Sequence, residues 1–497
     1  MRLGLGCMRI APDDLPAVVG EALAAGITLF DTARAYGDNE RLLAPLLRGT
    51  SARLVTKGGM VRSGAAWMPD GRASAIRRDC LESLEALDGV PIDLYLLHAP
   101  DHNVPWSTSL RALGKLLDEG LVRRIGVCNV NRAQLDEALS LVPVSAVQVA
   151  VSRYDDSAVR GGVVRRCEEA GVEVLAHSPL GGPRRVRRER AAEDLAWVLA
   201  QSPVVVPVVG ARTPTAVRSA VAALDLQAPV VDEPRVEVRR TADLRLVVGI
   251  AGAGKTRLAG ELVGYARLNR DERGGSLGGL VLELDALLAS GAERVVVDNT
   301  HVTRASRNRV VEVARRHGVP VTCVWLDTPL AEAQVNLVLR QLDLLGRLPA
   351  PEELKALAKQ HPGLMLPGSQ LRMQRELEPP DADEGFAEVV RVPFVRASRP
   401  GVPGAFVAAG VVDRVPTPSG PALIYGWQTS AVLPGAVTAV CPHPAGPPTC
   451  WCRPPLPGLV LAFCHEHGVD PTTSVLYGAS STDRRLAAAV GARYVEP

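Results

Sequence analysis

The chain is poor in aromatic side chains and has almost no net charge, and both shortages narrow the range of functions. Phe, Trp and Tyr make up 4% of the 497 residues, and the formal net charge at pH 7 is +2. Few aromatic rings disfavour base-stacking platforms, and a near-neutral chain has no global attraction to polyanions or anionic lipid. No apolar run approaches the roughly 20 residues of a membrane span, and the start of the chain lacks a secretion signal. We therefore expect a soluble, cytoplasmic protein with no membrane partner.

Cysteine is present but too scattered for a disulfide scaffold. The nine cysteines are spread over the whole chain, and Cys7, Cys80, Cys128 and Cys167 stand alone in apolar surroundings, as ordinary buried thiols do. The length exceeds what one hydrophobic core usually serves, so several domains are expected. Composition and pattern place them at residues 1–228, 244–395 and 396–497, with a proline-containing linker over 229–243.

The first 225 or so residues alternate short β-rich runs with helical patterns. The eight runs cover residues 3–6, 27–31, 53–57, 93–98, 125–128, 147–151, 172–176 and 204–209. Several helical stretches end before a glycine, as at Gly26, Gly120 and Gly171. Eight consecutive strand and helix units predict a (β/α)8 TIM barrel.

Polar residues close three of these runs. Asp31, Lys57 and His98 each stand at the end of an apolar strand, and Tyr36 follows Asp31 by five residues. Taken singly, each has an ordinary structural role, such as a cap, a surface lysine, a packed tyrosine or a hydrogen-bonded core histidine. The carboxyl ends of barrel strands meet at one rim, however, so their coincidence favours a catalytic set.

The barrel region resembles the aldo-keto reductases over nearly its whole length. The matching residues are 30–37 with Asn39 and Glu40, 56–58, 97–98, 126–129, Gln148, 176–181 and 207–212. The resemblance implies an NAD(P)H-dependent carbonyl reductase acting on a small-molecule carbonyl substrate. Cys128 stands where that family more often has serine.

The same resemblance gives each residue a role. Reducing a carbonyl leaves charge on its oxygen, which must receive a proton. Tyr36 would donate it, Lys57 held by Asp31 would favour the phenolate, and His98 would orient the carbonyl. The resemblance also implies cofactor contacts: Asn129 and Gln148 on the nicotinamide amide, and Ser178, Leu180, Gly181, Gly210 and Arg212 along the phosphates. Arg212 favours NADP over NAD.

A phosphate-binding loop opens the next domain. Residues 249–256 fit the pattern G-x-x-x-x-G-K-[ST], with a predicted strand before them and a helical pattern after them. In such a P-loop NTPase domain the backbone around Gly249, Gly252 and Gly254 would surround the phosphates of ATP, Lys255 would reach the β and γ oxygens, and Thr256 would hold Mg2+.

Further along, the domain resembles the kinase domain of polynucleotide 5′-kinases and their relatives. The matches are residues 269–273, 297–300 with 306–307, 333–340 and 384–386. The resemblance implies phosphoryl transfer to a hydroxyl group, with Asp271 as the general base and Arg340 as the clamp on the transferring phosphate. A small hydroxylated metabolite and a nucleic-acid 5′-end both remain open as acceptors.

Charge argues against a long nucleic-acid footprint on this domain. Residues 244–395 carry nineteen basic and nineteen acidic side chains. Because phosphate contacts dominate affinity for nucleic acid, a neutral domain would need arginines such as Arg304, Arg307 and Arg309 on one face.

The tail, residues 396–497, contains Cys441, His443, Cys450 and Cys452, whose spacing allows a closed, structural zinc site. Residues 453–458 and 478–483 resemble haloacid dehalogenase-type phosphatases of the zinc-loop class, which implies a small Rossmann-like module. The catalytic residues of that family are missing, because residues 406–410 contain no aspartate, and Pro454 and Ala479 replace a lysine and a metal-binding aspartate. We therefore interpret the tail as a pseudophosphatase module.

Together these patterns predict a bifunctional fusion of an NADP(H)-dependent reductase and an ATP-dependent kinase. An alternative is a nucleic-acid end-processing protein in which the barrel senses or reduces a sugar aldehyde while the kinase phosphorylates 5′-hydroxyl ends. A third interpretation makes the barrel a nicotinamide-sensing module, against which the intact set Asp31, Tyr36, Lys57 and His98 counts.

Overall fold

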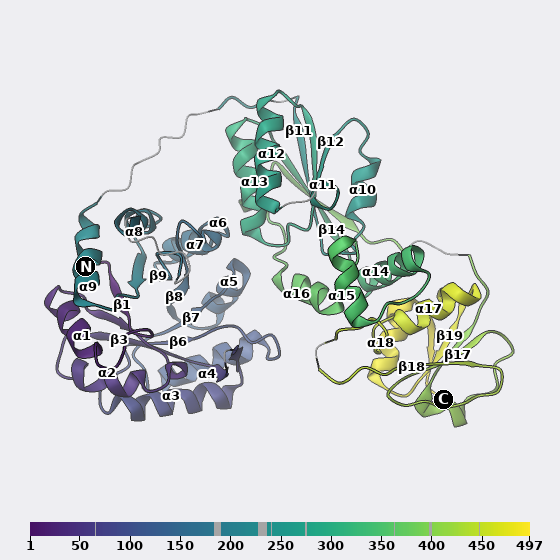
Figure 1. The fold of residues 1–497 in the computed structure, drawn as a ribbon, viewed down its shortest axis with the longest axis horizontal. Coiled ribbons are helices and arrows are strands. Elements are labelled where there is room, and N and C mark those ends of the chain that lie inside the picture. The colour runs from purple at the N-terminus through teal and green to yellow at the C-terminus, as the bar shows by residue number, and fades with distance from the viewer. Residues whose placement is uncertain are drawn as a thin grey trace. The chain divides into compact units, whose positions relative to one another are not determined.

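The computed structural model contains two compact units, one holding a barrel and the other holding two open sheets (Figure 1). The structure describes residues 1–64, 66–182, 190–226, 236–239, 241–273, 276–361, 363–396, 400–446 and 448–497. The expected linker, 229–243, lies mostly outside these residues. None of the helices in the described ranges has the length and apolar character needed to cross a membrane.

The first unit confirms the predicted barrel. Eight parallel strands close in the order β1-β10-β9-β8-β7-β6-β3-β2. Their bounds are β1 Gly4–Gly6, β2 Leu29–Asp31, β3 Arg53–Gly58, β6 Leu94–Leu97, β7 Ile125–Cys128, β8 Val144–Ala150, β9 Glu173–His177 and β10 Val205–Val209. Strands of a parallel barrel are covered on both faces, which explains their almost uninterrupted apolar runs.

Helices cover the outside of the barrel, and most of the hydrophobic core of the unit lies between them and the strands. They are α1 Leu15–Ala24, α2 Asn39–Leu47, α3 Ala73–Leu87, α4 Trp106–Asp118, α5 Arg132–Leu141, α6 Ser157–Arg160, α7 Val163–Ala170, α8 Ala191–Leu199 and α9 Pro214–Ala222, with the short 3-10 turns η1 Arg34–Tyr36 and η3 Ala223–Asp225. The sequence did not predict the antiparallel hairpin of β4 Met60–Ser63 and β5 Ala66–Pro69, which follows β3.

The second unit begins with a five-stranded parallel sheet ordered β12-β13-β11-β14-β15. Its strands are β11 Asp243–Val248, β12 Ala266–Asn269, β13 Arg294–Asp298, β14 Val321–Asp327 and β15 Glu388–Pro393. The helices are α10 Lys255–Glu261, α11 Arg270–Arg273, α12 Leu277–Ala289, α13 Arg304–Arg316, α14 Leu330–Leu345, α15 Pro351–Gln360 and α16 Pro367–Glu376, with the turn η4 Ala382–Glu384. The strand that leads into the phosphate-binding loop, β11, is central, as a P-loop domain requires.

A second five-stranded parallel sheet, ordered β18-β17-β16-β19-β20, completes this unit. It is built from β16 Ala405–Ala408, β17 Ala422–Trp427, β18 Val437–Cys441, β19 Val475–Tyr477 and β20 Arg493–Val495, with α17 Gly458–His467, α18 Ser481–Val490 and the turns η5 Ala409–Arg414 and η6 Pro471–Thr473. We call this part the C-terminal module, residues 400–497. Its strand order is that of a doubly wound, Rossmann-like sheet; the likeness to haloacid dehalogenases stays a prediction.

One hydrophobic core joins the C-terminal module to the P-loop part of the second unit. Leu337, Val338 and Leu342 of α14 and Leu354 of α15 belong to the same buried cluster as Phe406, Leu423 and Val460 of the module. Helix α14 accordingly packs against α17 and α18. The two sheets are therefore parts of one packed body.

Candidate functional sites

Side chains along each barrel strand alternate between the inside and the outside of the barrel, and this alternation brings polar side chains to the carboxyl rim. The barrel interior contains an apolar layer that includes Leu29, Val55, Leu96, Ala146 and Leu175. Side chains two residues apart on a strand point to the same face, so the next inward-facing residues lie directly above this layer. They are Asp31, Lys57, His98, Gln148 and His177.

An ion pair lies at the centre of this group. Lys57 is fully buried, and its Nζ lies 2.7 Å from Asp31 Oδ1 and donates to the Thr32 carbonyl at 2.6 Å. Gln148 Nε2 donates to the same Asp31 oxygen at 2.7 Å. Burial is the largest single effect and would lower the pKa of Lys57, but the charge and hydrogen bond of Asp31 together with the nearby Tyr36 and Cys128 outweigh it, and the pKa is raised. Lys57 is therefore an ammonium group at every physiological pH.

Tyr36 lies beside this ammonium. Lys57 Nζ is 5.3 Å from the centroid of the Tyr36 ring, and the ring stands edge-on to those of His98 and Trp67, at 5.7 and 6.0 Å between centroids. Burial raises the pKa of Tyr36, and Lys57 opposes the rise without cancelling it. The ammonium thus acts in the predicted direction, towards the phenolate, yet the phenol stays protonated at neutral pH and is able to donate a proton.

His98 is neutral. Burial, with the nearby Lys57 charge and His177, lowers the pKa of His98 to about 3. Its Nδ1 is buried and has no hydrogen-bond partner among the described residues. A neutral imidazole can still donate one hydrogen bond, whereas a charged one beside Lys57 would add repulsion.

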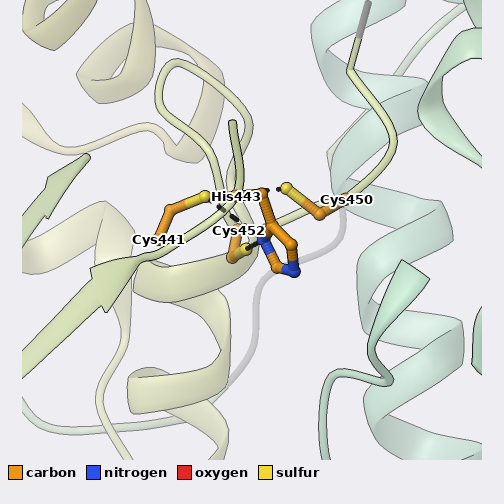
Figure 2. Close-up of side chains that lie close together, drawn as sticks. All are labelled: Cys441, His443, Cys450 and Cys452. Atoms are coloured by element: carbon orange, nitrogen blue, oxygen red, sulfur yellow. Dashed lines mark hydrogen bonds between the residues drawn. The ribbon is translucent and has the colours of Figure 1, made fainter. Parts of the chain in front are cut away.

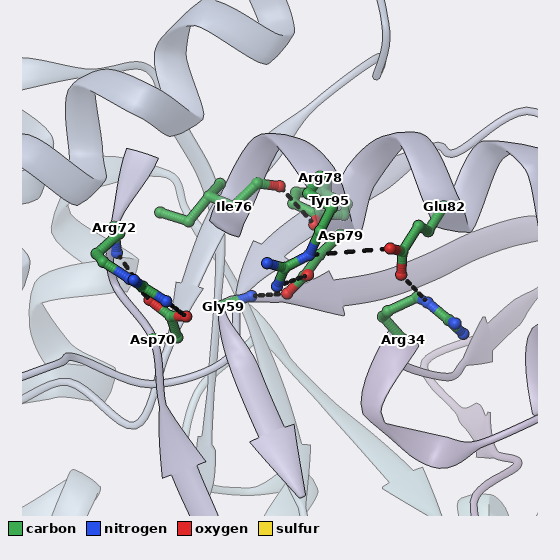
Figure 3. A network of polar contacts seen from close by, with 9 residues as sticks. All are labelled: Arg34, Gly59, Asp70, Arg72, Ile76, Arg78, Asp79, Glu82 and Tyr95. Carbon is green, nitrogen blue, oxygen red and sulfur yellow. Dashed lines mark hydrogen bonds and ion pairs between the residues drawn. The ribbon is translucent and has the colours of Figure 1, made fainter. Parts of the chain in front are cut away.

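Helix α3 fixes the segments that carry this site (Figure 3). Asp79 Oδ2 accepts from the backbone N–H of Gly59 at 2.9 Å, which anchors the turn between β3 and the hairpin. Glu82 Oε2 accepts from Arg34 Nε at 3.0 Å, which anchors η1. Gly59 has φ +73°, and a Cβ there would lie 2.6 Å from Leu97 Cδ1, so no larger residue fits. The same helix thus anchors η1, which carries Tyr36, and the turn that leads into the hairpin, which carries Trp67.

The predicted cofactor residues occupy the loops above the rim. Asn129 has φ +56°; its Nδ2 donates to the His98 carbonyl at 3.0 Å, and its Oδ1 lies 3.1 Å from His177 Nε2. Ser178, Leu180 and Gly181 follow β9, while Gly210 and Arg212 follow β10 and are exposed. Gln148 uses one of its two amide N–H donors on Asp31, and its Oε1 lies 3.9 Å from Cys128 Sγ.

His177 was not assigned a role from the sequence. Its pKa is lowered, mainly by burial, and it bridges Asn129 and Ser178, whose Oγ lies 3.3 Å from His177 Nδ1. The signal was present, because His177 stands two residues beyond the inward-facing Leu175 of β9.

The phosphate-binding loop of the second unit has the conformation that its glycines suggest. Gly252 and Gly254 have φ +85° and +97°, and a Cβ on Gly252 would lie 2.3 Å from the Ala333 carbonyl. Other side chains hold the loop carbonyls in place: Asn336 Nδ2 to Gly252 O at 2.8 Å, Thr328 Oγ1 to Ala253 O at 3.1 Å and Gln370 Nε2 to Ala251 O at 2.9 Å.

Lys255 folds back over this loop. Its Nζ donates to the carbonyls of Gly249 and Ile250 at 3.0 and 2.8 Å. Burial lowers the pKa of Lys255 to about 8; the charges of Asp298 and Asp271 oppose the fall, and that of Arg340 adds to it. Thr256 follows at the start of α10 and is exposed.

Two carboxylates lie on the β12 and β13 side of the loop. Asp271, in α11, is positioned by its backbone N–H, which donates to Asn269 Oδ1 at 2.7 Å. Asn269 Nδ2 donates at 2.7 Å to Asp298, which ends β13 opposite Val247 of β11. Asp298 was missed as a site residue, although an acidic residue at the end of the strand beside the P-loop strand is the usual metal-binding partner. Arg340, in α14, lies close enough to affect Lys255 and donates weakly to Gly363 O at 3.4 Å.

The structure removes Arg307 from the arginine face that was considered for nucleic-acid binding. Arg307 is fully buried, and its Nε and Nη2 each donate to Glu384 at 2.7 Å, while Nη1 donates to the carbonyls of His301 and Val302. Four of its five N–H donors are used inside the protein and the side chain is fully buried, so Arg307 does not reach an external phosphate. Arg307 and Glu384 are therefore structural.

The C-terminal module gathers the four predicted metal ligands (Figure 2). The ligand atoms of Cys441, His443, Cys450 and Cys452 all lie within 4.8 Å of one another. Cys441 Sγ is 3.7 Å from Cys450 Sγ and 3.5 Å from His443 Nδ1, and Cys452 Sγ is 3.3 Å from the same Nδ1. With Zn–S bonds of about 2.3 Å, a tetrahedron has sulfur–sulfur edges of roughly 3.8 Å, so the donor set fits zinc.

Among the described residues, the carboxyl end of the central strand of this module carries no carboxylate. The central strand β16 ends at Ala408 and is followed by Ala409. Asp483 is engaged inside the module: its Oδ1 accepts a hydrogen bond from Tyr425 Oη at 2.8 Å, and its Oδ2 accepts one from Ser480 Oγ. Without a carboxylate at the end of β16, no aspartyl-phosphate intermediate can form there.

Comparisons with known proteins agree with the first two parts. Residues 1–194 match the aldo/keto reductase family and residues 244–360 match an AAA domain family. The chain is 32% identical over 194 residues to a probable aldo-keto reductase of Glycine max, a match that covers 36% of this chain and 56% of that protein. The chain thus spans about half the length of this relative.

Solved structures similar to this chain include a glycerol dehydrogenase of Gluconobacter oxydans, 25% identical, and an aldo-keto reductase of Bacillus halodurans, 24% identical. Each match covers 46% of this chain and 88% of the other, with a TM-score of 0.41. From the family matches, residues 1–194 carry an aldo/keto reductase domain and residues 244–360 a P-loop-type AAA domain.

Proposed function

We propose that the barrel is an NADP(H)-dependent carbonyl reductase. The observation that carries this proposal is the convergence, at one rim, of the Asp31–Lys57 ion pair, a protonated Tyr36 and a neutral His98. When bound, the nicotinamide cofactor would supply the hydride. Tyr36 would donate its proton to the oxygen on which charge develops, and Lys57 would stabilise the phenolate that remains.

The other residues would orient the reactants. His98 would donate a hydrogen bond to the carbonyl oxygen. Asn129 and Gln148 would hold the nicotinamide amide, while Ser178, Leu180, Gly181, Gly210 and Arg212 would line the phosphates, with Arg212 favouring NADP over NAD.

The test is NADPH oxidation with a panel of aldehydes and ketones. Tyr36→Phe should lower kcat by roughly 10²- to 10⁴-fold, the usual contribution of a general acid, without loss of NADPH binding. Tyr95→Phe is the matched control, because Tyr95 Oη donates to Ile76 O in the helical layer, away from the rim. Equal turnover by both variants would remove Tyr36 from the mechanism.

We further propose that residues 244–395 transfer phosphate from ATP and Mg2+ to a hydroxyl group. The supporting observation is that Asp271, Asp298 and Arg340 lie close enough to Lys255 of an anchored P-loop for their charges to shift its pKa. Lys255 would release its loop carbonyls to bind the β and γ oxygens, and Thr256 with Asp298 would hold Mg2+. Asp271 would accept the proton of the attacking hydroxyl.

An acceptor screen tests this assignment, with polyols and a 5′-hydroxyl oligonucleotide side by side. Asp271→Asn should abolish transfer to the acceptor that the wild type uses, whereas Glu272→Gln, the next residue of α11, should not. Transfer to the oligonucleotide would make this an end-processing kinase; transfer to polyols alone would make it metabolic. Equal turnover by Asp271→Asn and wild type would refute the base.

The C-terminal module is, in our proposal, a catalytically inactive phosphatase-like module with a structural zinc ion. Cys441, His443, Cys450 and Cys452 would close the coordination shell, leaving no position for a substrate.

A further inference from the structure

The order of strands around the P-loop fixes the direction in which a nucleotide must lie. The two carboxylates, Asp271 and Asp298, follow β12 and β13, which lie on one side of β11. A transferring phosphate and its metal ion belong on that side. The nucleoside must then extend to the opposite side, towards the ends of β14 and β15.

A cavity of about 660 Å³ lies on that opposite side. One wall comes from the P-loop part, with Gly254, Thr328 and Asn336 among its residues. The other wall comes from the C-terminal module: Leu461, Cys464 and His465 of α17, and the segment 468–472 that includes η6. The volume falls within the roughly 300–1,000 Å³ typical of ligand pockets.

The two walls are locked together, so the cavity is a fixed feature of the second unit. Arg396, which follows β15 and lines the cavity, donates to both carboxylate oxygens of Glu332 in α14, at 3.1 and 2.6 Å. Its Nη2 also donates to Ala489 O in α18 at 2.6 Å. On the module side, Asp470 shapes η6 by accepting from the N–H and hydroxyl of Thr472 at 2.9 and 2.8 Å.

We propose that the C-terminal module forms one wall of the nucleoside end of the ATP site, so that α17 and η6 contact the base or ribose of the bound nucleotide. This inference rests on the proposed kinase function. It gives the inactive phosphatase-like module a role in the P-loop reaction: the module completes the site in which the phosphoryl donor binds.

Binding of ATP and of inorganic tripolyphosphate to the full chain, measured by calorimetry, tests the proposal. Tripolyphosphate occupies the P-loop and has no nucleoside, so changes to the module wall should leave its affinity unchanged. Cys464→Phe, which fills the cavity, should weaken ATP roughly tenfold or more, as a blocked pocket contact does. His465→Ala, at an exposed position that cannot unfold the module, should weaken ATP by a few-fold, and Glu466→Ala, the next residue, should not.

A photoreactive ATP analogue, 8-azidoadenosine triphosphate, gives a direct readout. Peptides that contain residues 461–472 should be labelled, and excess ATP should prevent the labelling. Label confined to residues 244–395, or wall variants that bind ATP like the wild type, would overturn the proposed wall while tripolyphosphate binding keeps the P-loop assignment. A wild-type chain that binds neither ATP nor tripolyphosphate would instead overturn the kinase proposal itself.

Discussion

At the scale of single residues, burial and one ion pair set the charges of the barrel site. Lys57 keeps its charge because Asp31 is 2.7 Å away, whereas the pKa of His98 is lowered to about 3 and that of Tyr36 is raised. The rim therefore holds one cation, Lys57, which is paired with Asp31, and two neutral proton donors, His98 and Tyr36. This is the distribution that a carbonyl oxygen acquiring negative charge requires.

These charges predict the pH dependence of the reductase. A neutral His98 has no titration near its ordinary pKa of about 6.5, and Tyr36 ionises only above its ordinary value of about 10. We expect kcat/KM for carbonyl reduction to be level from roughly pH 6 to 9 and to fall at higher pH as the phenol loses its proton. An acid limb near pH 6.5 that disappears in His98→Gln would show instead that the imidazolium is the active form.

Trp67 gives a second prediction at this scale. It is 39% exposed and its ring lies 6.0 Å from those of both Tyr36 and His98, so it forms an apolar side to the space above the proton donors. Trp67→Ala should raise KM for aldehydes roughly tenfold, as lost pocket contacts do, with kcat changed much less. Trp67→Phe should restore most of the affinity. A fall in kcat with unchanged KM would mean that Trp67 positions Tyr36 rather than the substrate.

At the scale of elements, the sequence predicted the strands correctly where an apolar run is local and a polar side chain of the candidate site ends it. All eight barrel strands were predicted, and Asp31, Lys57 and His98 were found because they end inward-facing strand positions. The hairpin β4–β5 was missed because its strands are short and β5 is exposed along its whole length, which leaves no buried periodicity. Arg307 was misjudged because nothing local shows that Glu384, 77 residues later, neutralises it.

The loop that carries the candidate metal ligands is linked to distant elements of the second unit. Trp451, between Cys450 and Cys452, donates from Nε1 to Met365 O at 2.8 Å, just before α16. Helix α16 in turn holds the P-loop through Gln370 and Ala251 O. The metal ligands and the phosphate-binding loop are therefore linked through one helix.

Metal analysis of the purified chain should find one zinc ion per molecule. Cys452→Ser should lose the ion and destabilise the second unit by about 4 kcal/mol or more, as loss of a structural metal does. Cys464→Ser, a cysteine of the same module outside the cluster, should keep the zinc. Zinc retained at full occupancy by Cys452→Ser would show that the four residues do not form the site.

At the scale of the whole molecule, the buried hydrophobic clusters divide the chain into two units, whereas the sequence pattern suggested three domains. Composition suggested three domains, but the P-loop part and the C-terminal module share one buried cluster. Removing the module would expose Leu337, Val338 and Leu342 of α14 to water, so these two parts should unfold together. The barrel has its own core and should unfold separately.

Scanning calorimetry of the full chain should accordingly show two transitions, each responding to one ligand. NADPH should shift only the barrel transition, and ATP with Mg2+ only that of the second unit, because a ligand stabilises the state that binds it. At about 100 times Kd the gain is roughly 2.7 kcal/mol, which for units of this size raises Tm by roughly 5–10 °C. Lys255→Ala serves as the control: it should cancel the shift with ATP and keep the shift with NADPH. A third, independent transition that Cys452→Ser alone lowers would contradict the shared core.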